Sequence, residues 1–168
     1  MTYRTRIATV LVAAAIIAGD AVAQGTRRPL APADIDAIAK LLMLEDTRTF
    51  DSAALATLLR SSHPEVRRRA ALSVGRIADP LGRALLHPAR RDADTAVAAT
   101  VVFATAQLYD TASVAWLDSL MSRPSTPVTV ATEAARALGM IRTTDARAAL
   151  ARFLGTAPRD ARASVVGE

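Results

Sequence analysis

The sequence predicts an all-α fold in which antiparallel helix pairs stack side by side as an α-solenoid. Its composition is 51% hydrophobic but only 4% aromatic, which suits helices packed closely through small side chains. Glycine and proline number only seven and eight among 168 residues, a sparseness that argues against a disordered chain. The third observation is a helical pattern that recurs along the chain, which is typical of repeat architectures.

The first 23 residues have the layout of a secretory signal peptide. Arg4 and Arg6 precede an apolar run over residues 7–19, and residues 21–23 supply the small side chains of a cleavage site before Gln24. The run is shorter than the roughly 20 residues that a membrane-spanning helix needs. We therefore expect cleavage near Ala23 and export to the periplasm or the medium. The alternative is a chain that keeps an N-terminal membrane anchor.

The mature chain divides into a capping region and an array of repeats. Residues 24–50 contain one helix, "ADIDAIAKLLMLED", which we expect to pack on the front of the array as a partial repeat or cap. Four repeats follow at about 51–79, 80–110, 111–143 and 144–168, the last of them incomplete. The sequence leaves the oligomeric state open.

Each repeat is expected to carry a longer second helix that starts from an anchoring valine. Apolar residues at offsets 0, 4, 8 and 11 from that valine fall on one helical face and form the core stripe. The residue at offset 9 is tiny, which would let a neighbouring helix approach. The anchors are Val66, Val97 and Val130, and the tiny residues are Gly75, Ala106 and Gly139.

A shorter first helix precedes each second helix and is rich in leucine. An acid follows two of the second helices, Asp79 and Asp110, where it could cap the next helix. Arginines near the ends of the first helices, at 60, 91 and 123, complement the helix dipole. The apolar residues of the first helices are Leu55, Leu58, Leu59, Leu81, Leu85, Leu86, Leu117, Leu120, Met121, Leu150, Phe153 and Leu154.

These stretches resemble the HEAT-repeat family, especially its short bacterial lyase-type form. The resemblance covers about residues 51–154 and is clearest in "VRRRAALSVGRIAD". The later copies depart from the pattern, with Ala98 and Ala131 in place of an arginine and Ala106 in place of a glycine. The resemblance implies a right-handed α-solenoid of about four helix pairs, with protein–protein binding as the commonest role. It carries no shared catalytic residues to this chain.

The arginines of the clearest copy are the strongest candidate for a binding site. On a helical wheel Arg67 lies beside the core edge, where it can pair with an acid or carbonyl of a neighbouring repeat. Arg68, Arg69 and Arg76 face outward and form a candidate patch for an acidic protein partner. The other repeats do not continue these arginines, and no aromatic residues are interleaved with them, so a nucleic-acid site is the weaker interpretation.

The remaining candidates favour structural roles. His63 and His87 lie on separate repeats, each before a proline, and make a poor metal site. Asp92 and Asp94 precede a helix and are expected to cap it. Trp116 is expected at the core edge. With no cysteine in the chain, disulfides and thiolate chemistry are excluded, and no motif predicts a catalytic, cofactor or metal site.

We therefore interpret the sequence as an exported, non-enzymatic scaffold or adaptor that binds a protein through its helical surface. The first alternative is an accessory or remnant domain of a larger exported enzyme. A nucleic-acid-binding protein, which would have to stay in the cytoplasm, and a pigment-type lyase are weaker alternatives. No membrane contact is expected after signal cleavage.

Overall fold

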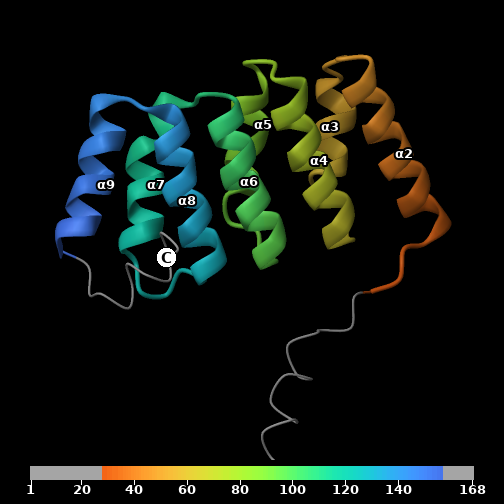
Figure 1. Cartoon of the computed structure of the whole chain (residues 1–168). Coiled ribbons are helices and arrows are strands. Elements are labelled where there is room, and N and C mark those ends of the chain that lie inside the picture. Colours follow the sequence, from red (N-terminus) through yellow and green to blue (C-terminus); the bar gives the residue numbers. More distant parts are fainter. Residues whose placement is uncertain (1–27, 157–168) are drawn as a thin grey trace, which may run out of the picture.

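The computed structural model describes residues 28–156, and this part of the chain is built of α-helices without a strand (Figure 1). The predicted signal peptide and the C-terminal part of the last repeat lie outside the described residues. No helix within 28–156 has the length and apolar character that crossing a membrane requires. The helices are α2 (Pro32–Asp46), α3 (Ser52–Leu58), α4 (Pro64–Ile77), α5 (Gly82–Ala89), α6 (Thr95–Gln107), α7 (Val114–Ser122), α8 (Val128–Ile141) and α9 (Thr144–Thr156), with a 3-10 turn, η2 (Thr111–Ser113), before α7.

The helices form two layers. The longer helices α4, α6 and α8 pack side by side in one layer, and α2 joins that layer by packing on α4. The shorter helices α3, α5 and α7 form the other layer, and α9 extends it by packing on α7 and α8. Figure 1 shows the stack from α2 at one end to α9 at the other. The predicted all-α solenoid of helix pairs is confirmed.

The predicted core stripe of the second helices is buried throughout. All twelve stripe positions, eleven within α4, α6 and α8 and Leu108 at the C-cap of α6, are at most 8% exposed. Burial of these faces removes apolar surface from water at about 25 cal/mol per Å², which stabilises each helix against its neighbours. The stripe residues are Val66, Ala70, Val74, Ile77, Val97, Val101, Thr105, Leu108, Val130, Ala134, Leu138 and Ile141.

Two leucines that we assigned to the apolar face of the first helices are exposed. Leu81 is 68% exposed because it precedes α5 and lies outside the helix, and Leu154 is 46% exposed near the end of α9. Asp110 stands at the N-cap position of η2, but its carboxylate makes no capping hydrogen bond because Arg90 and Ser113 donate to it instead. Asp79 accepts a hydrogen bond from the Leu81 amide and so caps the turn before α5.

The four helices of the layer that contains α2, α4, α6 and α8 all end in the same way. Arg48, Ala78, Tyr109 and Arg142 have positive φ angles of 52°, 61°, 47° and 57°, the left-handed conformation that commonly terminates a helix. The last three stand at offset 12 from the anchoring valines. Aligning Arg48 with them puts α2 in register with the second helices, with Asp36 at offset 0. Helix α2 therefore takes the position of a second helix in the stack but lacks the anchoring valine.

Candidate functional site

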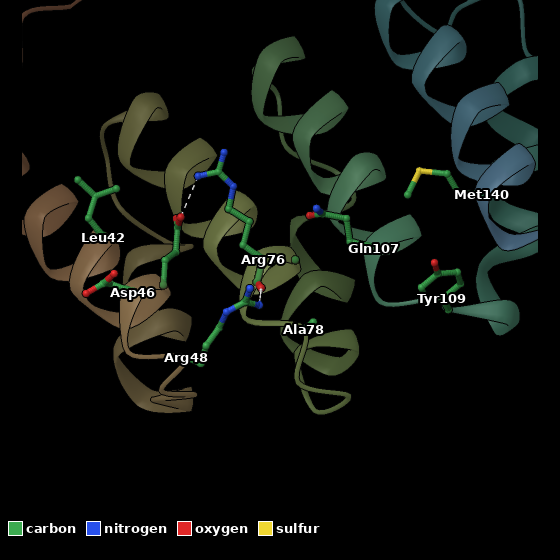
Figure 2. Close-up of a pocket in the computed structure, with 10 residues that line it drawn as sticks. Leu42, Asp46, Arg48, Arg76, Ala78, Gln107, Tyr109 and Met140 are labelled. Atoms are coloured by element: carbon green, nitrogen blue, oxygen red, sulfur yellow. Dashed lines mark hydrogen bonds and ion pairs between the residues drawn. The ribbon is translucent and has the colours of Figure 1, made fainter.

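A groove of about 870 Å³ crosses the C-terminal ends of α2, α4, α6 and α8 (Figure 2). It lies on the layer formed by α2, α4, α6 and α8, called here the second-helix layer. Residues far apart in the sequence meet there because equivalent positions of successive repeats lie side by side. The lining residues are Leu42, Glu45, Asp46, Arg48, Gly75, Arg76, Ala78, Gln107, Tyr109 and Met140.

One residue from each helix forms a row along the groove. Asp46, Arg76, Gln107 and Met140 all stand at offset 10, so the repeat register brings them into line across the four helices. The row passes from an acid to a base, an amide and a thioether. A ligand lying along it meets a different chemical group at each helix, spaced by the 8–10 Å that separates packed helices.

Charged side chains tie the first two helices of the groove together. Glu45 of α2 accepts hydrogen bonds from the Ser73 hydroxyl at 2.6 Å and from Arg76 at 2.8 Å. Arg48 donates to the backbone carbonyl of Arg76, as Figure 2 shows. Neither guanidinium group uses all five of its N–H donors in these contacts. The remaining donors can therefore bind a carboxylate from a partner.

The close contact between α4 and α6 depends on Gly75. A Cβ added there would overlap Oε1 of Gln107 and lie 2.9 Å from Cα of Ala104. The buried Gln107 Oε1 has no hydrogen-bond partner among the described residues. The predicted close approach is confirmed at Gly75, whereas nothing in the described chain lies within 4 Å of a Cβ added at Gly139.

An apolar row begins at Leu42 in the groove and continues beside it, one helical turn nearer the N-termini than the row at offset 10. Leu42, Leu72 and Phe103 stand at offset 6, which points away from the core stripe. Leu42 is 47% exposed, and Leu72 and Phe103 are half-buried. The groove and this apolar row together combine apolar area with charged and amide groups, the composition expected of a protein-binding surface.

The predicted arginine patch divides into two parts. Arg68 forms a two-point ion pair with Glu65, with distances of 2.8 and 2.6 Å, and Arg69 contacts the same carboxylate at 3.3 Å. The hydrogen bond from Arg68, aided by both arginine charges, lowers the pKa of Glu65 against the opposing effect of burial. Arg76 lies apart from this cluster, in the groove.

Arg67 makes the contact between repeats that its wheel position predicts. Its guanidinium binds both carboxylate oxygens of Asp92 at 2.7 and 2.9 Å and also donates to the Ser61 carbonyl at 3.0 Å. Burial by itself would raise the pKa of Asp92, but hydrogen bonds from Arg67 and the Asp94 amide hold that pKa below its ordinary value. Asp94 caps α6 as predicted, accepting from the Ala96 and Val97 amides.

The histidines and the tryptophan have structural surroundings. His63 is 3% exposed and caps α4 by accepting from the Glu65 amide, whereas His87 precedes the proline inside α5. Trp116 lies at the core edge as predicted, with the Arg90 guanidinium 4.4 Å from its ring centre. Within residues 28–156 no group of three or more potential ligands is placed to hold a metal ion.

Sequence reasoning found Arg76 but missed the other charged residues of the groove. Glu45 and Asp46 belong to α2 and Arg48 follows its C-terminal end. The register of α2 with the repeats is hidden because Asp36 replaces the anchoring valine. The shared left-handed helix ends reveal that register in the structure. No sequence signal marks those ends, since none of the four residues is glycine.

Comparison with known proteins agrees with the helical repeats. A family model described as HEAT repeats matches residues 82–167, about half of the chain. No curated protein matches the sequence. This match agrees with the resemblance in the sequence and with the paired helices in two layers. The chain belongs to the HEAT repeat family.

Proposed function

We propose that this protein is an exported, non-enzymatic scaffold or adaptor that binds another protein across its second-helix layer. The observation that carries the proposal is the groove, in which four successive helices each present a different group beside an apolar row. HEAT repeats commonly mediate protein–protein interaction, and this surface offers both apolar contact area and polar groups that can select a partner.

The partner we propose presents an apolar strip with an acidic residue opposite α4. Leu72 and Phe103 supply the apolar contact, and Arg76 supplies N–H donors that Glu45 leaves free. Arg68 and Arg69 lie on the same helix but outside the groove, where they share the Glu65 carboxylate. We therefore expect Arg76 to contribute more to binding than the other two arginines.

The test is recovery of the partner by affinity purification from the organism that makes the protein. Phe103→Asp should reduce recovery of the partner more than tenfold, since it places a charge in the apolar contact. Ala53→Glu is the matched control, because it adds the same charge on exposed α3 in the other layer. Equal loss of the partner with both variants would overturn the assignment of the binding surface.

A second pair of variants separates the arginines. Arg76→Gln should reduce partner recovery, whereas Arg68→Gln combined with Arg69→Gln should change it little because those two side chains lie outside the groove and share the Glu65 carboxylate. A larger loss of partner with the Arg68 and Arg69 variant than with the Arg76 variant would indicate that the partner binds at the cluster around Glu65. Export is tested separately by sequencing the N-terminus of the protein from a periplasmic or extracellular fraction, where we expect Gln24 to be the first residue.

A further inference from the structure

The two ends of the described stack are complementary. At one end α2 belongs to the second-helix layer, and residues 28–156 provide no first helix to pair with it. At the other end α9 belongs to the first-helix layer, and the same residues provide no second helix to follow it. Placing α2 of one copy after α9 of another would complete a helix pair and continue both layers.

The repeat register shows which residues would meet. Inside the stack, Gly75 of α4 forms a hollow that Ala104 of α6 occupies. Gly139 of α8 is the equivalent of Gly75, and in the described chain its hollow is open. Met43 of α2 is the equivalent of Ala104, and it is 56% exposed. The equivalents of Gly75 and Ala104, which contact each other between α4 and α6, therefore lie at opposite ends of the stack.

The charges of the two ends are also complementary. Helix α2 carries four acids and one lysine, a net charge of −3, whereas residues 128–156 carry four arginines and two acids, a net charge of +2. Asp46 on α2 is exposed and makes no ion pair within the described residues. Arg142 is exposed at the opposite end, and its Nε donates to the Gly139 carbonyl at 3.3 Å.

We propose that two copies associate head to tail, with α2 of one docked against α8 and α9 of the next. Met43 of the docked α2 then lies over Gly139 of the other copy. Asp46 of the same α2 lies beside Gly139 as Gln107 lies beside Gly75 within one copy, and it is next to Arg142. The contact uses different surfaces on the two copies, so it is heterologous and can add further copies to an open chain. The proposal does not rest on the function proposed above, although Asp46 also lines the groove.

Sedimentation velocity of the purified protein over a wide concentration range tests this proposal. We expect the average mass of the wild type to rise with concentration, and to fall when salt screens the complementary charges. Met43→Glu and Gly139→Leu should each raise the dissociation constant more than tenfold. Both changes are at exposed positions, so circular dichroism should show an unchanged helical fold.

Mixing the two variants gives the sharpest result. The Gly139→Leu protein keeps an intact α2 and the Met43→Glu protein keeps an intact α8, so the mixture should form a one-to-one dimer and stop there. Gly155→Leu is the control, because Gly155 is also open but lies on the side of α9 opposite buried Phe153. It should associate like the wild type.

Three results would overturn the proposal. The first is a wild type that stays monomeric at every concentration. The second is a loss of association with Met43→Glu but not with Gly139→Leu, which would indicate contact between two α2 helices. The third is a Gly139→Leu monomer that is less stable to unfolding, which would mean that residues 157–168 of the same chain occupy the hollow.

Discussion

Replacing Gly75 by alanine tests the close contact between α4 and α6. In a helix interior this change alone is worth about 1 kcal/mol in favour of alanine. Here the added Cβ would overlap Oε1 of Gln107 and lie 2.9 Å from the backbone Cα of Ala104. The side chain can rotate away but the backbone cannot, and overpacking of this kind typically costs about 1–3 kcal/mol. We expect a net loss of about 1 kcal/mol.

Gly139→Ala is the matched control for this prediction. It makes the same chemical change at the same offset, but nothing in the described chain lies within 4 Å of the new Cβ. It should therefore raise the free energy of unfolding by about 0.5–1 kcal/mol. The assay is urea unfolding followed by circular dichroism at low protein concentration, with the slope checked for two-state behaviour. Gly75→Ala as stable as Gly139→Ala would refute the packing argument.

Three further predictions concern stability. Asp92→Asn should lower the free energy of unfolding by about 1–3 kcal/mol at neutral pH. Because the folded-state pKa of Asp92 is lowered, the stability that its carboxylate contributes is complete above about pH 4 and is lost as pH falls through that lowered pKa. A series of unfolding curves at different pH values should therefore show a weaker acid dependence in the variant. Ala78→Gly should stabilise by up to about 1 kcal/mol in thermal unfolding, because glycine relieves the cost of a φ of 61°. Arg90→Ala should destabilise by about 3 kcal/mol in urea, since it leaves the buried Asp110 carboxylate without its cation, and Arg90→Lys should recover part of that loss.

The buried face of the second helices could be predicted from the sequence because a 3.6-residue period determines which positions share a side. Offsets 0, 4, 8 and 11 needed no information beyond the chain itself. The same reasoning placed Arg67 at the core edge, where the structure has its ion pair with Asp92. Glu65 lies three and four residues before Arg68 and Arg69, a spacing typical of helical ion pairs, so their shared contact with Glu65 was also open to sequence reasoning.

The groove could not be predicted, since it depends on contacts between elements. Arg76 was found as an outward arginine, but its position beside Glu45 and Arg48 depends on where α2 packs. Helix α2 lacks the valine that marks the other second helices, and the backbone turn at Arg48 reveals its register only in three dimensions. The exposure of Leu81 was missed for a similar reason, because α5 begins one residue later than its apolar pattern suggests.

Site-specific photo-crosslinking tests most directly the claim that the second-helix layer binds the protein partner. A photoreactive amino acid replaces Gln107 in the groove or Ala115, which is exposed on α7 in the other layer, and each protein is irradiated in the organism that makes it. We expect one crosslinked partner from position 107, reduced by Phe103→Asp, and little adduct from position 115. An equal yield of the same adduct from position 115 would contradict it.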